Sequence, residues 1–218
     1  LLAGEEKTER TIPVCETVFP EKFADLNAVR EVLLTPEKQV YALIAPAFMG
    51  QFGEGVSPGA IRAALKCAGF SGMVEVAVFA DILTLKEALE FDRHVNRDTD
   101  FLLTSCCCPV WVSMIRNIYG ELVPYMPGAV SPMIAAGRAV KKMHPDAVTV
   151  FIGPCLAKKK EAKEPDICDA IDVVLTFQET AMLFEAMGDC AAADGGGCKR
   201  TFFGSRQNLC ADREAISE

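Results

Sequence analysis

The chain has 218 residues, of which 50% are hydrophobic and 24% are charged, a composition typical of a folded globular protein rather than a disordered one. Its 22 basic and 30 acidic residues give a formal net charge of -8, which argues against nucleic acid and anionic membrane surfaces as partners. Apolar runs stay shorter than the roughly 18 residues of a membrane span, and the N-terminus lacks a signal-peptide pattern, so we expect a cytoplasmic protein.

The first part of the chain is polar and then alternates between two kinds of segment. Residues 1–20 contain two prolines and are interpreted as a linker from a missing upstream domain. Apolar runs that predict strands follow at Val40–Ala47, Met73–Ala80, Phe101–Thr104, Val148–Ile152 and residues 170–176.

Helices are predicted between these strands. The first has a capping residue at Ser57, a proline at its first position, Pro58, and an end at Gly69. Further helical patterns cover residues 83–95, 110–122, 131–144 and 178–188. This alternation predicts an α/β fold with a parallel sheet and helices on both of its faces.

The chain has ten cysteines, and their distribution does not suit a disulfide framework. Cys106, Cys107 and Cys108 are consecutive, and Cys155 follows a predicted strand. Clustered thiols in a reducing compartment indicate metal binding or redox chemistry. Successive side chains of an extended loop point to opposite sides, so at most two of the three consecutive thiols can bind one metal.

Positive charge is predicted beside both cysteine loops. A proline stands beside each cysteine, Pro109 after Cys108 and Pro154 before Cys155, and a helix or turn follows, so backbone N–H groups would point at whatever the thiolates bind. Lys158 lies three residues beyond Cys155, and in a helical turn its ammonium returns to the same side. The arrangement favours an anionic ligand.

Two motifs in this order resemble those of one enzyme family. The stretch TSCCCPVWV at 104–112 resembles the TSCCPxWV loop of the [FeFe]-hydrogenase catalytic domain, and PCLAKKKE at 154–161 resembles its PCxxKxxE loop. Shorter pieces at 45–47, 80–90 and 131–133 also follow the order of that family. We therefore assign residues 21–188 to an iron hydrogenase-like domain and leave the Gly/Ala/Cys-rich tail, 189–218, unassigned.

The resemblance implies two lobes of parallel sheet that hold an H-cluster, which is a [4Fe-4S] cubane joined to a di-iron subcluster with CO and CN ligands. The implied reaction is the reversible reduction of protons to H2. By resemblance, Cys108 and Cys155 are cubane ligands, Cys107 is a thiol that passes protons to the di-iron unit, and Lys158 donates a hydrogen bond to a cyanide.

Other site residues are also assigned by resemblance. Ala45, Pro46 and Pro132 match residues that line the di-iron pocket, and Glu87 and Glu90 match the carboxylates of a proton path. The implied electron partner is a ferredoxin-like donor or an upstream ferredoxin domain.

The sequence departs from the family at three places. The CxxxC loop that supplies the remaining cubane ligands is not found, so the second lobe is expected to be truncated or rebuilt, with Cys198 as the candidate third ligand. Pro127 stands where the family has a serine in the proton path. Gly153 replaces a methionine, a change associated with sensory-type members.

Several alternatives stay open. The domain could be an H2- or redox-sensing iron–sulfur module without significant turnover, or an iron–sulfur assembly relative that lacks the di-iron unit. The cysteine loop could be a structural thiol cluster, or it could be shifted so that Cys106 is the thiol and Cys107 the ligand. Glu87 and Glu90 could form a hydrated helix face, and Lys158 could be solvated like its neighbours at 159 and 160.

Overall fold

The computed structural model describes residues 18–193, except for residues 54, 105 and 106. Its centre is a four-stranded parallel sheet with the strand order β2-β1-β3-β4. The strands are β1 (Val40–Ile44), β2 (Gly72–Glu75), β3 (Val148–Gly153) and β4 (Val173–Thr176). The α/β fold with a parallel sheet flanked by helices is thereby confirmed.

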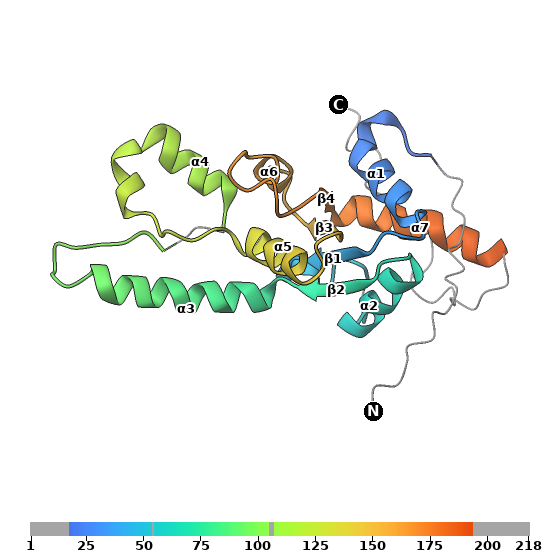
Figure 1. The fold of residues 1–218 in the computed structure, drawn as a ribbon, viewed down its shortest axis with the longest axis horizontal. Helices are drawn as coiled ribbons and strands as arrows, with labels where there is room; N and C mark the ends of the chain where they lie inside the picture. The colour runs from blue at the N-terminus through green and yellow to red at the C-terminus, as the bar shows by residue number, and fades with distance from the viewer. Residues whose placement is uncertain (1–17, 54, 105–106, 194–218) are drawn as a thin grey trace.

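Helices cover both faces of this sheet. The helices α1, α2 and α7 lie on one side of the sheet and α5 and α6 on the other, whereas α3 and α4 extend away from it (Figure 1). The helices are α1 (Ala24–Leu33), α2 (Pro58–Cys67), α3 (Ala77–His94), α4 (Pro109–Ile118), α5 (Pro132–Met143), α6 (Ala157–Glu161) and α7 (Phe177–Ala193). The core lies between these layers, and its fully buried side chains include Leu26, Leu43, Ile44, Ile61, Ile134, Ile152, Leu175 and Leu183.

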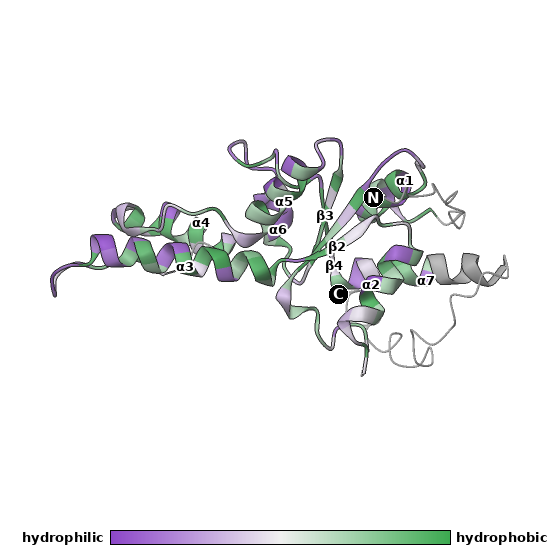
Figure 2. Cartoon of the chain, turned by 60° about the horizontal axis from the view of Figure 1, so that its bottom comes forward, coloured by the Kyte–Doolittle hydropathy of each residue, from purple (hydrophilic) through white to green (hydrophobic). Residues whose placement is uncertain are grey.

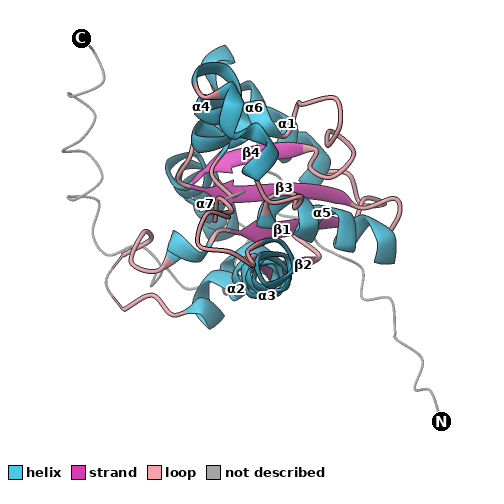
Figure 3. Ribbon diagram, turned by 90° about the vertical axis from the view of Figure 1, so that its left-hand side faces the viewer, coloured by secondary structure: helices cyan, strands magenta, loops and turns pink. Residues whose placement is uncertain are grey.

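The two central strands create a switch in the chain's direction of travel. From β1 the chain moves to β2 on one side, and then it crosses back to β3 on the other side of β1. Figure 3 looks along the layers and shows β1 and β3 between the two outer strands. Ligand sites of open parallel sheets form beyond the carboxyl ends of two neighbouring strands whose connections lead to opposite sides of the sheet in this way.

All strands of the described residues belong to this one sheet. The strands β1 and β2 come from the first half of the chain, and β3 and β4 come from the second half. The two β/α series therefore combine into a shared sheet within the described ranges.

The strand predicted at Phe101–Thr104 is wrong as a whole. The segment 101–104 has no regular secondary structure, because its backbone bonds Tyr125 instead of a strand: Leu103 N donates to Tyr125 O at 2.8 Å. The ring of Phe101 stacks on Tyr125 with 4.2 Å between centroids. Cys108 therefore does not follow a strand in the way the sequence predicted.

Two other predicted strands end earlier than expected. The strand predicted to run over Val40–Ala47 stops at Ile44, because Pro46 has no N–H for a ladder and opens a 3-10 turn over Pro46–Phe48. The strand predicted over Met73–Ala80 stops at Glu75, and residues from Ala77 onward join the following helix. The strand predicted at Val148–Ile152 is confirmed and extends to Gly153.

The predicted ends of α2 are confirmed in detail. The Ser57 hydroxyl caps the helix by accepting a hydrogen bond from Ala60 N at 3.2 Å, and Pro58 occupies the first turn. Gly69 follows the helix with φ +99°, a conformation that a residue with a Cβ adopts only with strain.

The helix α3 is only lightly packed. Its residues form no part of the buried core, and its main described neighbour is α5. Val78, Ile82, Leu85 and Leu89 recur on one side of the helix, and each is more than half exposed. Figure 2 shows apolar residues along this extended part of the chain.

We predict opposite effects for two glycine substitutions inside helices. A Cβ added at Gly137 of α5 would collide with the backbone oxygen of Ala170, so Gly137→Ala should lower the free energy of unfolding by about 1 to 3 kcal/mol. Gly59 of α2 has ordinary space for a Cβ, and Gly59→Ala should raise that free energy by up to about 1 kcal/mol. Urea unfolding of both variants measures the difference, and equal effects would contradict this packing.

Candidate functional site

The carboxyl ends of β1 and β3 bring two predicted site regions together. The last residue pair of the two strands is Ile44 with Ile152, and Ala45 N donates to Ile152 O at 2.8 Å. Pro46 continues from β1, while Cys155 follows β3 directly after Pro154 and is half-buried. Ala45, Pro46 and Cys155 therefore share one edge of the sheet.

The N-terminus of α5 lies at the same edge. The helix packs on β1 and β3, and His144 at its far end stacks on Tyr41 at the start of β1, with 4.9 Å between ring centroids. The helix therefore runs antiparallel to the strands, which places Pro132 at their carboxyl ends. Ser131, directly before it, is 3% exposed, and its hydroxyl has no hydrogen-bond partner among the described residues.

The consecutive cysteines lead into α4 as predicted. Cys108 is the capping residue of this helix, Pro109 is its first residue, and Cys108 O accepts a hydrogen bond from Val112 N at 3.0 Å. Cys107 and Cys108 are exposed, so both are accessible to a ligand. Cys106, and with it the alternative register of the loop, lies outside the described residues.

Lys158 joins the two cysteine loops. Its ammonium donates a hydrogen bond of 2.8 Å to the backbone oxygen of Cys107, although the two residues are 51 positions apart. The ammonium also forms an ion pair with Glu161, with 2.6 Å between Nζ and Oε2. The angles of this contact do not suit a hydrogen bond. Both side chains are about nine-tenths buried, so the alternative of a solvated Lys158 is wrong.

The position of Lys158 still allows a further contact. An ammonium has three N–H donors, and the Cys107 oxygen accepts from one of them, while the Glu161 carboxylate lies beside the group as its counter-ion. Sequence reasoning assigned no role to Glu161, although its spacing of three from Lys158 on a helix is a signal for an ion pair. The pair keeps a buried positive charge next to the cysteine loops.

The described thiols fit part of an iron–sulfur donor set. A cubane normally takes four thiolates, and Cys108 and Cys155 provide two candidates. Within the described ranges, no group of three or more His, Cys, Asp or Glu side chains is arranged to hold a metal ion. Cys198 lies outside those ranges. The described residues thus do not form a complete cluster site, and we derive no reaction step through the cluster.

The neighbours of residue 153 explain why a glycine occupies this position. A Cβ at this position would come within 2.6 Å of the Phe151 ring and 3.2 Å of the Ala45 Cβ. The Phe151 ring therefore occupies the space that a larger residue before Pro154 would need. This departure from the family motif is part of how the edge of the sheet packs.

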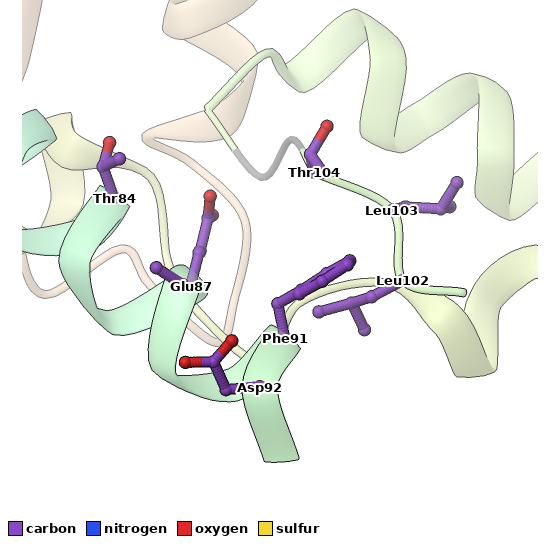
Figure 4. A pocket seen from close by; sticks show the side chains of 8 residues that line it. Thr84, Glu87, Phe91, Asp92, Leu102, Leu103 and Thr104 are labelled. Carbon is purple, nitrogen blue, oxygen red and sulfur yellow. The ribbon is translucent and has the colours of Figure 1, made fainter. Parts of the chain in front are cut away.

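Glu87 lines a pocket between α3 and the segment that leads to the cysteines. The pocket has a volume of about 370 Å³. Figure 4 shows Glu87 and Phe91 on α3, with Leu102 and Thr104 on the opposite segment. The pocket thus places a carboxylate opposite the chain just before the cysteine loop.

Glu90 has a backbone partner on the segment that precedes α5. Its Oε1 accepts a hydrogen bond from Gly128 N at 3.2 Å, and Lys86 of the same helix lies 3.5 Å from Gly128 O. Glu87 and Glu90 are both half-buried, on a helix that has no fully buried residue. Pro127, directly before Gly128, is buried and has no side-chain proton to transfer.

One polar side-chain atom near these elements was given no role in the sequence analysis. The indole Nε1 of Trp111, in the first turn of α4, is buried without a hydrogen-bond partner in the described part of the chain. A buried indole N–H usually has a hydrogen-bond partner, so we expect a further acceptor to bind this donor beside α4.

A separate observation concerns membranes. Among the residues that the structure describes, no helix combines the length and apolar character needed to cross a bilayer.

Comparisons with known proteins agree with this arrangement. Residues 38–199 match the family model of the iron-only hydrogenase large subunit, C-terminal domain. Iron hydrogenase 1 of Clostridium pasteurianum is 31% identical over 179 residues, which cover 73% of this chain and 31% of that protein. The NADP-reducing hydrogenase subunit HndD of Solidesulfovibrio fructosivorans is 31% identical over 202 residues, covering 81% of this chain and 34% of that protein.

A protein with a different role also matches. The cytosolic Fe-S cluster assembly factor NAR1 of Mycosarcoma maydis is 31% identical over 115 residues, covering 43% of this chain and 14% of that protein. The chain spans about a third of the length of the two hydrogenases named above. The family match covers well over half of the chain, and the chain therefore belongs to the iron-only hydrogenase family, within the C-terminal domain of its large subunit.

Proposed function

We propose that this chain is an iron-hydrogenase domain that supplies part of an H-cluster site for the reversible reduction of protons to H2. The observation that carries the proposal is the hydrogen bond from Lys158 Nζ to Cys107 O at 2.8 Å, because it joins the two cysteine motifs at the carboxyl ends of the sheet. The names of the hydrogenase relatives support the same reaction class.

In this proposal each loop contributes one thiolate. Cys108 and Cys155 bind the cubane, and further ligands come from outside the described residues, with Cys198 as the candidate. Lys158 donates a further N–H to an anionic ligand such as cyanide, and Ala45, Pro46 and Pro132 line the di-iron pocket. When bound, the H-cluster would relay electrons to or from the electron partner and would supply the iron at which H2 is formed or split.

Proton transfer is the step that this chain supports poorly. Cys107 is the proposed proton donor at the cluster, and Glu87 faces the pocket that leads toward its loop. Beyond it, Glu90 accepts a hydrogen bond from the Gly128 amide next to Pro127, whose side chain has no hydroxyl to pass a proton. We therefore propose slow turnover for a matured protein that contains the whole domain, with a ferredoxin-like electron donor and a cytoplasmic location as further expectations.

Two other functions remain in competition. The match to NAR1 favours an iron–sulfur assembly relative that lacks the di-iron unit. Gly153 in place of the family's methionine favours a sensory module, because by resemblance this change is associated with sensory-type members of the family. A sensory module would show CO and CN bands but negligible turnover, and an assembly relative would show iron and sulfide without those bands.

Cluster loading tests how much of the donor set this chain supplies. With two thiolate ligands in the described residues, we expect the 218-residue chain to purify largely without iron and to evolve no H2 even after maturation. Iron and acid-labile sulfide analysis, with infrared spectra of the CO and CN stretches, gives the result. Robust H2 evolution by this chain alone would show that its donor set is complete.

Substitutions of the cysteines should separate ligand binding from proton transfer. In a matured protein that contains the whole domain, Cys108→Ser should lose iron, because a hydroxyl is a far poorer ligand than a thiolate. Cys107→Ser should retain iron and the infrared bands while H2 turnover falls steeply, because a hydroxyl is too weak an acid. Iron content and turnover are measured for both variants.

The remaining cysteines provide the controls. Cys67→Ser, in an exposed position on α2, should change neither iron content nor turnover. If Cys107→Ser loses iron and Cys108→Ser retains it, the register of the loop is shifted by one and Cys106 is the proton-carrying thiol.

A substitution at Pro127 should improve proton transfer. Pro127→Ser introduces a hydroxyl beside the Glu90 and Gly128 contact, so turnover of the matured protein should rise several-fold if the proposed path is used. Pro127→Ala is the matched control because it removes the ring without adding a hydroxyl. Equal turnover of the two variants would contradict this path.

A further inference from the structure

A second lysine of α6, Lys159, binds carboxylates on a different side of the helix from Lys158. Lys159 Nζ lies 2.7 Å from Asp25 Oδ2 on α1 and 2.9 Å from Glu179 Oε1 on α7. The prediction from the sequence that Lys159 is solvated is wrong. Adjacent residues of a helix point about 100° apart, so Lys158 can face the cysteine loop while Lys159 faces α1 and α7.

The carboxylate of Glu179 is itself held in place. Its Oε2 accepts a hydrogen bond from Thr176 N at 2.7 Å, and Glu179 N donates to Thr176 Oγ1 at 3.1 Å. This reciprocal pair is a capping box at the start of α7. Lys159 therefore contacts a fixed acceptor at the carboxyl end of β4.

The charge on Lys159 is well supported. Burial lowers its pKa, but the hydrogen bonds to Asp25 and Glu179 outweigh that effect, and the pKa is raised above the ordinary lysine value. The side chain is 22% exposed, so solvent screens the pair only partly. The ammonium is therefore charged at any pH at which the protein would be studied.

The helix that carries Lys159 cannot be stable alone. With five residues, α6 is far shorter than the length at which an isolated helix forms in water. Its described neighbours are α4 and β4. Its position therefore depends on side-chain contacts, and Lys159 provides ion pairs to two further helices.

We propose that Lys159 is a positioning residue that clamps α6 between the cysteine site and the opposite layer of the fold. By fixing α6, it sets where Cys155 and Lys158 lie relative to the Cys107 loop. The inference rests on the proposed function only for the identity of that site, because the clamp itself is a property of the cluster-free chain.

The test measures how often the site opens. In the cluster-free chain, Lys159→Met should raise the rate at which iodoacetamide alkylates Cys155 by roughly threefold or more, because the loop opens more often. Peptide mass spectrometry resolves the rate at Cys155, with Cys67 on α2 as the internal reference. Lys160→Met is the matched control, since it removes the same charge from an exposed neighbour and should leave the rate unchanged.

Two further variants separate positioning from general stability. Lys159→Arg should restore the alkylation rate, because a guanidinium can contact both carboxylates. Arg62→Met removes an ion pair with Glu75 between α2 and β2 and should leave Cys155 unaffected. Trp111, the chain's single tryptophan, lies on α4 next to α6, and its emission should shift in Lys159→Met alone.

The outcomes distinguish this inference from the proposed function. Equal alkylation rates for the wild-type chain, Lys159→Met and Lys160→Met would overturn the clamp, whatever the iron content of the protein. Faster alkylation in Lys159→Met that Lys159→Arg reverses would support the clamp even if infrared spectra later excluded an H-cluster.

Discussion

The parallel pairing of β1 with β3 is the constraint on which the rest of this structure depends. The register from Val40 with Val148 to Ile44 with Ile152 joins strands that are about a hundred residues apart in the chain. Because both strands end at the same level, the segments after them meet at one edge of the sheet. That edge contains the proline turn after β1, the turn with Cys155 after β3 and the N-terminus of α5.

The second level of organisation is electrostatic and centres on α6. Lys158 is buried with Glu161 and bonds the cysteine loop, whereas Lys159 bonds carboxylates on α1 and α7. A short helix thus holds two cations that serve different sides of the molecule. The cost of taking two charges out of water offsets most of the attraction within a buried ion pair, so such a pair adds little net stability. We therefore expect these lysines to fix the geometry around Cys155 more than they stabilise the fold.

The periphery is organised differently from the sheet. The helix α3 has an exposed apolar row, and the chain between it and α4 bonds Tyr125 instead of extending the sheet. Glu87 and Glu90 lie there, ten and thirteen residues beyond the start of α3 at Ala77, hence about 15 and 20 Å along the helix. The proposed proton path therefore crosses a lightly packed part of the described chain.

The alternation of apolar strands with capped helices determined the α/β fold class and the ends of α2, because strand hydrophobicity and helix capping are local properties. The loop motifs identified Cys108, Cys155 and Lys158 as candidates for the same reason. The sequence could not show that residues 101–104 lack a strand partner, nor that Lys159 is bound while Lys160 is exposed. Those outcomes depend on which distant segments lie opposite each residue, and the packing of the helices on the sheet decided them.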